Sequence, residues 1–356
     1  MPSNPPQQYL QTIHESNLPD SRVFGELKRR VQEAGLLEKN LKYSIYKVSQ
    51  ALVLVGLAVA ALAFTERLWL QLLEAVFLAM ACTQLGFIAH DTGHRQIFRS
   101  GRMHDLLGLL LVNGLLGFSW GWWVQKHNRH HANPNHLDHD PDIHFPVVAF
   151  SPEQAAEKPA HLRFFIKHQA FLFFPLLSLV AYSLRVDSVK YLSGNASRYR
   201  GAEILLLLVH VVLYAGFLAV ALGPLRGLLV AIVHQAFFGI FLGSVFANNH
   251  KGMPLVGSGV RLEYVYHQVA TSRNLKRHPL TDWWYGALGC QIEHHLFPTM
   301  PRQNLRKAEE IVKAFCAERS IPYHETGVFE SYREVLGHLH EVSMSLRPRR
   351  LPDAGT

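Results

Sequence analysis

Seven histidines in three short clusters are the residues of this chain best suited to chemistry. The clusters are His90-Asp91-Thr92-Gly93-His94, His127-Asn128-Arg129-His130-His131 and Gln291-Ile292-Glu293-His294-His295. Imidazole is a common ligand for iron, copper, nickel and zinc. One ion in such a site holds about six ligands, and catalysis needs some of these positions open. Seven imidazoles therefore predict a centre with two metals.

The spacing within the clusters fits ligands carried by helices. His90 and His94 are four residues apart, which on a helix places them on one face about 5.4 Å apart. The other two clusters add histidines on adjacent turns. Acids beside the clusters are expected to orient imidazole N–H groups, although each one alone fits a solvated acid or a helix cap better. These acids are Asp91, Asp138, Asp140, Asp142 and Glu293.

Four long apolar blocks are expected to position the clusters, at residues 48–64, 68–89, 204–222 and 227–247. Each has a length that can cross a bilayer. Short turns join them into two helical hairpins. Lys39, Lys42 and Lys47 precede the first block, and a basic flank places that end in the cytoplasm. His90 and His94 then emerge on the cytoplasmic side.

Two further apolar blocks, at residues 106–124 and 169–184, are predicted not to cross. A single crossing at 106–124 would put His127 and His94 on opposite sides of the membrane, where they could not share one centre. Tryptophans at its end fit a re-entrant or interfacial segment. Trp120 and Trp123 are candidates for the wall of a substrate tunnel, and an aromatic belt at the lipid interface explains them equally well.

The composition agrees with a multi-pass membrane protein. Hydrophobic residues make up 49% of the chain and charged residues only 17%, and the charges gather in loops and at the ends. The net charge of +8 fits anionic lipid or an acidic protein partner, and no motif supports nucleic-acid binding. Cys82, Cys290 and Cys316 have no metal-knuckle spacing, so we expect reduced thiols and a site without thiolate ligands.

The expected fold class is an all-α integral membrane protein with four transmembrane helices, interfacial helices and a cytoplasmic helical cap that holds the dimetal site. Residues 1–44 are predicted to form a loose tail and an amphipathic helix from residue 21, which lies either on the membrane surface or against the catalytic face. Residues 45–310 form the membrane domain. Residues 311–356 are expected to form the C-terminal cytoplasmic part, which ends in a basic tail. Its helices are predicted at about 304–318, where the first begins within the membrane domain, and at 328–345.

An imidazole-rich site suits iron, with copper or zinc also possible. A metal pair at the bilayer surface favours an apolar substrate, and breaking an unactivated C–H bond requires an oxidant such as O₂ activated on iron. The sequences HDTGH, HNRHH and QIEHHLFPTMPR, together with HANPNHLDHDPDI and TSRN at 271–274, resemble the membrane fatty-acid desaturase family. Glutamine at the start of the third cluster resembles the front-end and bacterial acyl-CoA branches.

This resemblance implies an enzyme that uses two irons, O₂ and two electrons to place a cis double bond in a fatty acyl chain. The ligands it implies are His90, His94, His127, His130, His131, His294 and His295, with His250 matching a further histidine at the end of the last membrane helix. Gln291 stands where many relatives have histidine, so it is a possible direct or water-mediated ligand.

The chain contains neither the HPGG haem motif of fused cytochrome b5 domains nor a ferredoxin-type cysteine run. Electrons are therefore expected from a separate ferredoxin or cytochrome-type donor with its reductase. Arg185, Lys190, Arg198 and Arg200 are candidates for its docking site. The acyl substrate is carried by coenzyme A or a lipid, and the expected location is a bacterial inner membrane with the active site on the cytoplasmic side.

Two other functions remain open. A fatty acyl hydroxylase on the same scaffold shares the first C–H cleavage, and only its product distinguishes it. A non-enzymatic membrane metal-binding protein is the second alternative, although ligands along a path inside the spans would fit that function better.

Overall fold

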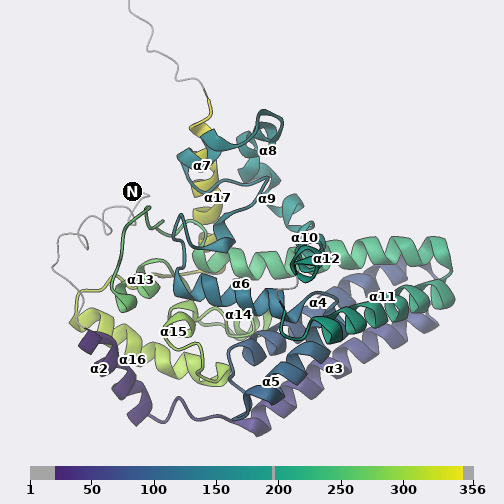
Figure 1. Cartoon of the computed structure of the whole chain (residues 1–356), viewed down its shortest axis with the longest axis horizontal. Coiled ribbons are helices and arrows are strands. Elements are labelled where there is room, and N and C mark those ends of the chain that lie inside the picture. Colours follow the sequence, from purple (N-terminus) through teal and green to yellow (C-terminus); the bar gives the residue numbers. More distant parts are fainter. Residues whose placement is uncertain (1–20, 195–196, 348–356) are drawn as a thin grey trace, which may run out of the picture.

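The computed structural model describes residues 21–194 and 197–347, so the tails predicted at the two ends of the chain lie largely outside it. Four long helices run side by side in two hairpins (Figure 1). They are α3 (Leu41–Phe64), α4 (Leu68–Gly93), α11 (Arg200–Leu222) and α12 (Pro224–His250). Each is long and apolar enough to cross a membrane. The predicted all-α membrane fold with four spanning helices is confirmed.

The two helices of each hairpin do not contribute equally to the interior. In the most apolar stretch of each helix, 56% of α4 and 50% of α12 is buried, against 17% of α3 and 6% of α11. Leucines and valines of α3 and α11 are widely exposed, as expected of surfaces that face lipid. The inner helices α4 and α12 pack on each other and end at His90 to Gly93 and at His250. They therefore deliver histidines from both hairpins to one end of the bundle.

The two apolar segments that were predicted not to cross are both bent. The first comprises α5 (Gly101–Gly108), the π-helical η1 (Leu109–Leu116) and α6 (Trp120–Ala132), and it turns by 109° before α6. The second, α9 (Gln169–Leu177) and α10 (Val180–Ser193), turns by 70°. Gly117 makes the first bend with a φ of 75°, and a Cβ there would collide with the His210 ring. The bends agree with the expected re-entrant or interfacial segments.

A helical cap covers the histidine end of the bundle. Its lower part in Figure 1 consists of α2 (Ser21–Glu33), α13 (Tyr264–Ala270), α15 (Gln291–Leu296) and α16 (Leu305–Glu318). Leu27 and Val31 of α2 are fully buried in a core with Phe315 of α16. Of the two placements expected for this amphipathic helix, the structure has the one packed on the cap. Its apolar face is therefore not available to lipid.

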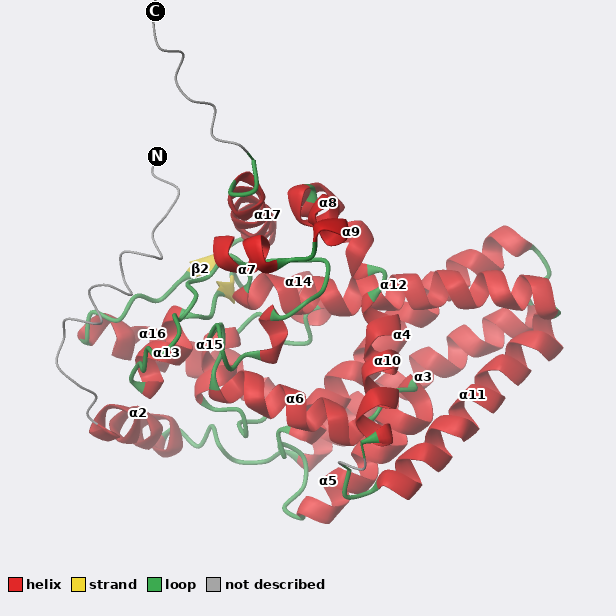
Figure 2. Cartoon of the chain, turned by 45° about the horizontal axis from the view of Figure 1, so that its top comes forward, coloured by secondary structure: helices red, strands yellow, loops and turns green. Residues whose placement is uncertain are grey.

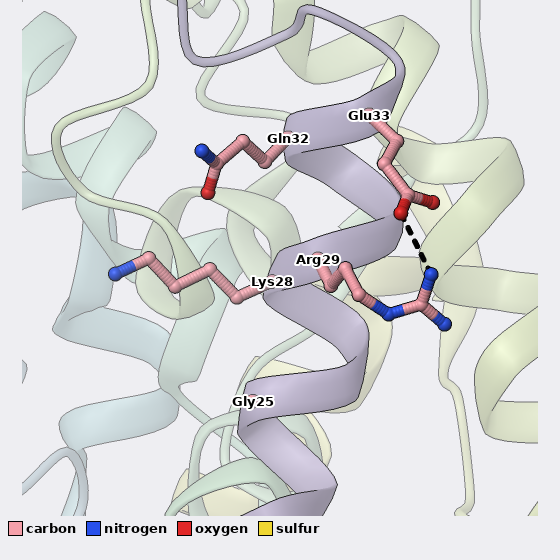
Figure 3. Close-up of a pocket in the computed structure, with 5 residues that line it drawn as sticks. All are labelled: Gly25, Lys28, Arg29, Gln32 and Glu33. Atoms are coloured by element: carbon pink, nitrogen blue, oxygen red, sulfur yellow. Dashed lines mark hydrogen bonds and ion pairs between the residues drawn. The ribbon is translucent and has the colours of Figure 1, made fainter.

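The outward face of α2 is polar. Figure 3 shows Lys28 and Gln32 projecting to one side of the helix and Arg29 paired with Glu33 on the other. The Arg29 guanidinium lies 2.7 Å from the Glu33 carboxylate, and both side chains are exposed. Exposed pairs of this kind contribute little to stability, so the buried leucine and valine of α2 hold it in place.

The upper part of the cap joins the middle of the chain to its end (Figures 1 and 2). Its elements are η2 (Pro141–Ile143), α7 (Pro152–Glu157), η3 (Ala160–Leu162), α8 (Arg163–Lys167) and α17 (Val328–Met344), and the remaining short elements are α14 (Pro279–Trp284) and η4 (Arg302–Asn304). Helix α17 packs on α9 and on the end of α12. The strands of the described residues, β1 (Asn274–Leu275) and β2 (Glu325–Thr326), pair in parallel and join the loop after α13 to the chain before α17.

Candidate metal centre

The structure brings all eight predicted histidine ligands together. They form two groups in which one ring nitrogen of each residue lies within 4.8 Å of those of the others. We call them the five-histidine cluster, which comprises His90, His94, His127, His131 and His294, and the three-histidine cluster, which comprises His130, His250 and His295. Residues more than 200 positions apart, such as His90 and His294, thus share one cluster. Two separate groups of ring nitrogens are the arrangement expected for two metals.

Helix α6 supplies ligands to both clusters. His127 and His131 are four residues apart and reach the five-histidine cluster, whereas His130 points to the three-histidine cluster. Helix α15 repeats this division with His294 and His295. The ends of α4 and α12 complete the two groups. Two pairs of adjacent histidines are therefore each divided between the two clusters.

In the three-histidine cluster, the outer nitrogen of every ring has a fixed partner. The Nδ1 of His130 lies 3.0 Å from both carboxylate oxygens of the fully buried Asp140. The Nδ1 of His250 donates to the Thr271 carbonyl at 2.9 Å. The Nδ1 of His295 donates to the Gln268 side-chain oxygen at 2.9 Å. These acceptors place the proton on Nδ1, which leaves each Nε2 with a free lone pair facing the cluster.

The inward Nε2 atoms of this cluster are close together. Those of His130 and His250 are 3.3 Å apart, and those of His250 and His295 are 3.0 Å apart. Unprotonated nitrogens cannot hydrogen-bond to one another, so lone pairs at this distance repel unless a cation lies between them. Two nitrogens at about 2.1 Å from one metal are about 3.0–3.4 Å apart for right-angled or tetrahedral coordination. The donor set therefore fits a transition metal.

The five-histidine cluster has similar inner distances and different outer contacts. Its Nε2 atoms lie 2.8 Å apart for His94 and His127 and 3.2 Å apart for His131 and His294. The buried Nδ1 atoms of His131 and His294 have no hydrogen-bond partner among the described residues. The Nδ1 of His90 lies 4.0 Å from Asp91, which is too far for a hydrogen bond. Packing rather than hydrogen bonding holds these rings.

Burial favours the neutral form of five of the clustered imidazoles. It lowers the pKa of His94 to about 3 and those of His127, His131, His294 and His295 well below the usual range, and the neighbouring imidazoles add to this effect in each case. Neutral imidazole is the form that binds metal. These five histidines are therefore in the form that binds metal near pH 7.

Gln291 lies at the three-histidine cluster. Its amide nitrogen is 2.9 Å from the Nε2 of His250, and its amide oxygen accepts a hydrogen bond from Asn249 at 3.0 Å. The side chain is buried. The structure thus places Gln291 beside the three imidazoles with its oxygen turned away from them.

The acids expected around the clusters have different surroundings. Asp140 contacts His130 directly, and Asp142 is 3.6 Å from the same ring and pairs with Lys126. Lys126 and the other nearby cations hold the pKa of Asp142 well below its usual range despite its burial. Asp138 is exposed, bonds to Ser258 and is not part of either cluster.

Asp91 and Glu293 adjoin ligands in sequence and bond elsewhere. Asp91 forms a buried ion pair with Arg302 at 3.0 Å. Glu293 is fully buried and accepts hydrogen bonds from Asn274 and Tyr323 at 2.7 and 2.8 Å. Burial raises the pKa of Glu293 to about 7. Both acids brace the backbone next to a ligand, and neither makes a hydrogen bond to an imidazole.

The two tryptophans proposed as tunnel walls stack against the centre. The Trp123 ring lies 4.7 Å from the His127 ring in a stacked arrangement, and Trp120 stacks on Trp123 at 5.9 Å. A Cβ at position 93 would collide with the Trp123 ring, so Gly93 allows this close approach. The indoles cover one side of the five-histidine cluster rather than forming an exposed belt.

Residues outside the three motifs complete the site. Glu203 at the start of α11 is fully buried, and one of its carboxylate oxygens accepts hydrogen bonds from Ser119 at 2.5 Å, from Asn113 at 3.2 Å and from the Gly121 N–H at 3.2 Å. These bonds fix the first turn of α6. Arg273 is also fully buried and caps the end of α12 through the carbonyls of Asn248 and Lys251.

Only some of these supporting residues belong to a motif that can be recognised in the sequence. Thr271, Arg273 and Asn274 belong to the TSRN motif, which could have been read as a brace for the last cluster. Gln268 and Glu203 stand in no recognisable pattern. A further group, His136, Asp138 and His139, gathers near the surface, away from the two clusters.

Comparisons with known proteins agree with this geometry. Residues 67–327, more than half of the chain, match the fatty acid desaturase family. The chain is 31% identical over 332 residues to an acyl-lipid (9-3)-desaturase of Physcomitrium patens, which covers 90% of the chain and 62% of that relative. It is 31% identical to a Delta(6)-fatty-acid desaturase of Caenorhabditis elegans and to a Delta(8)-fatty-acid desaturase of Euglena gracilis, covering 92% and 84% of the chain and 76% and 74% of those relatives.

Proposed function

Because this chain belongs to the fatty acid desaturase family, we propose that it is an O₂-dependent desaturase that inserts a cis double bond into a long fatty acyl chain. The observation that carries this proposal is the convergence of eight histidines in two clusters. The names of the Delta(6) and Delta(8) relatives agree with the front-end branch. The chain spans 62% of the first relative's length and about three-quarters of the other two, so the activity is proposed for this chain on its own residues.

We assign one iron to each cluster, with the imidazoles of His90, His94, His127, His131 and His294 around one and those of His130, His250 and His295 around the other. All-nitrogen sites of this kind suit iron, and no described thiolate competes for it. When bound, an iron pair would activate O₂ with electrons from the donor and so supply an oxidant for the C–H bond that no side chain can provide. Gln291, whose amide oxygen accepts from Asn249 and whose amide nitrogen faces His250, would contact this metal through a bound water rather than directly.

The residues around the clusters hold the ligands and keep water away. Asp140, Gln268 and the Thr271 carbonyl fix the tautomers of the three-histidine cluster. Trp123 and Trp120 cover the five-histidine cluster, and we assign to them the wall along which the acyl chain lies. A dry, fixed setting of this kind favours removal of hydrogen from one chosen CH₂–CH₂ pair.

The electrons come from a separate ferredoxin or cytochrome-type donor with its reductase. Of the four candidate docking residues, Arg185 is half-buried and donates to backbone carbonyls within the fold, whereas Lys190, Arg198 and Arg200 are exposed. Docking is therefore assigned to the exposed members. The membrane location follows from the spans, and we propose that the metal end faces the cytoplasm because basic residues precede α3. The three relatives come from eukaryotes and do not support the expected bacterial inner membrane.

The test is expression in a desaturase-deficient host with fatty-acid profiling and measurement of bound iron. The wild-type chain is expected to produce a new cis-unsaturated acid, and His294→Ala is expected to abolish it. Phe329→Ala, at a widely exposed side chain on α17, is the control and should retain activity. A hydroxylated product would favour the hydroxylase alternative, and an iron-loaded wild type that leaves the profile unchanged would refute the proposal.

A further inference from the structure

A small cavity lies where the hairpin of α3 and α4 meets the cap. It has a volume of about 240 Å³ and lies between the start of α3, the end of α4 and the segment that carries α14. Its polar lining residues are Tyr43, Lys47, Gln50, Gln84, Asp282 and Arg302. None of these residues belongs to the two histidine clusters, so the cavity is separate from the metal centre.

The cavity presents more positive than negative charge. Its one acid, Asp282, is already paired with Arg306 at 2.6 Å. Lys47 has no carboxylate partner among the described residues, and its ammonium donates to the Gln50 side chain at 3.1 Å. The nearby carboxylate that attracts Lys47 is Asp91, which already pairs with Arg302, so two cations share one acid. An anion in the cavity would balance the remaining positive charge.

Arg302 adds a second positive charge to the lining. Its side chain is buried, with 6% exposed, and it pairs with Asp91 at 3.0 Å. Its Nε–H has no hydrogen-bond partner among the described residues. This nitrogen is enclosed, so Arg302 contributes to the cavity mainly through the positive charge of its guanidinium.

The position of the cavity connects it with both the membrane and the metal centre. Lys47 lies in the second turn of α3, at the membrane end that faces the cap, where basic side chains reach lipid phosphates. On the inner side, the Arg302 partner Asp91 directly follows the ligand His90. An anion held here would be bound at the interface and next to the five-histidine cluster.

We propose that this cavity binds the phosphate ester of the acyl donor and thereby sets where the acyl chain enters beside α4. This inference rests on the proposed desaturase function and names the chemistry of its substrate. Phosphate is common to phospholipids and to coenzyme A. The volume is below that of typical sites for drug-sized ligands, so it fits a phosphate ester and not a whole nucleotide.

Binding measurements with purified, iron-loaded protein in detergent test this proposal. The probes are a fluorescent phosphatidylcholine, a fluorescent acyl-coenzyme A and a fluorescent monoacylglycerol that has no phosphate. Lys47→Gln is expected to weaken binding of a phosphate-bearing probe about tenfold, which corresponds to one charge-assisted hydrogen bond, and to leave monoacylglycerol binding unchanged. Gln50→Glu, which places a carboxylate beside Lys47, is expected to weaken it as well.

Lys42→Gln is the matched control, because Lys42 is exposed on the same helix and does not line the cavity. Weakening confined to phosphatidylcholine identifies a lipid donor, and weakening confined to acyl-coenzyme A identifies the thioester. The proposal is wrong if Lys47→Gln binds both phosphate probes as tightly as wild type, or if it weakens all three probes equally. Because binding is measured without turnover, a chain that binds these probes and makes no unsaturated product would refute the proposed function and leave this inference standing.

Discussion

The two histidine clusters differ in how their rings are held. In the three-histidine cluster, each outer nitrogen bonds to an acceptor supplied by Asp140, Thr271 or Gln268. In the five-histidine cluster, the outer nitrogens of His131 and His294 have no partner among the described residues. One cluster therefore has few ligands with fixed orientation, and the other has many ligands held by packing.

This difference implies two ways to retain a metal. Orienting contacts raise the basicity of a ligand and remove the cost of fixing its ring, which matters most where few ligands are present. Additional ligands give tolerance, because the loss of one leaves others in place. We therefore expect the three-histidine cluster to be sensitive to its surroundings and the five-histidine cluster to be sensitive mainly to its packing.

Removing one ligand from each cluster should give the largest effect. His295→Ala leaves His130 and His250 as the imidazoles of its cluster, whereas His90→Ala leaves four in the other. We expect His295→Ala to lose one of the two irons and all activity, and His90→Ala to keep both irons with impaired activity. Iron content by mass spectrometry together with fatty-acid profiling measures this. Equal iron loss in the two variants would remove the distinction between the clusters.

Asp140→Asn should give the next largest effect. The amide keeps the shape of the carboxylate and removes the charge that orients His130, so iron affinity at one site should fall by about 10- to 100-fold. Competition with a chelator measures the affinity of each site. Asp138→Asn is the control, since Asp138 is exposed and bonds to Ser258. If both variants lose iron alike, orientation by Asp140 is not the cause.

Gln268→Leu should have a smaller effect of the same kind. The His295 ring loses a neutral acceptor, and such hydrogen bonds are about half as strong as those to a carboxylate. The same chelator competition should show a loss of a few-fold, below that of Asp140→Asn. Gln125→Leu, at an exposed glutamine on α6, should change nothing. A larger loss for Gln268→Leu than for Asp140→Asn would reverse the order that the contacts predict.

Glu203→Gln should have the smallest effect on metal binding and should not distinguish the clusters. The carboxylate fixes the start of α6, which carries ligands of both. Losing its charge weakens a buried hydrogen-bond group by about 1–2 kcal/mol, which thermal unfolding in detergent detects. We expect a small, equal loss of affinity at both sites, with Glu157→Gln, at an exposed acid, as the control. A loss at only one site would show that α6 does not act as one rigid unit.

The sequence predicts the spans and the convergence of the eight histidines because both depend on residue type. Long apolar blocks need a bilayer, and the requirement that His94 and His127 share one side excludes a crossing between them. The bend at Gly117 and the early start of α3 at Leu41 depend on backbone conformation and capping by Asn40, which block lengths do not reveal.

The contacts around the ligands are less predictable for a physical reason. Three aspartates alternate at 138, 140 and 142, and only the loop conformation decides which one faces His130. Asn135 begins that loop with a φ of 57° and donates its backbone N–H to Asp140. The acceptor for His250 is a main-chain carbonyl, which no residue type identifies. The sequence therefore predicts which histidines come together better than it predicts which residues orient their rings.

The two histidine pairs at 130–131 and 294–295 have a consequence for how the enzyme can change during evolution. Neighbouring residues on a helix point about 100° apart, so each pair supplies one histidine to each cluster from one rigid backbone. The separation of the two clusters is then set by helix geometry and not by loops. Insertions in the connecting segments can change the surroundings of the site while the distance between the two clusters stays the same.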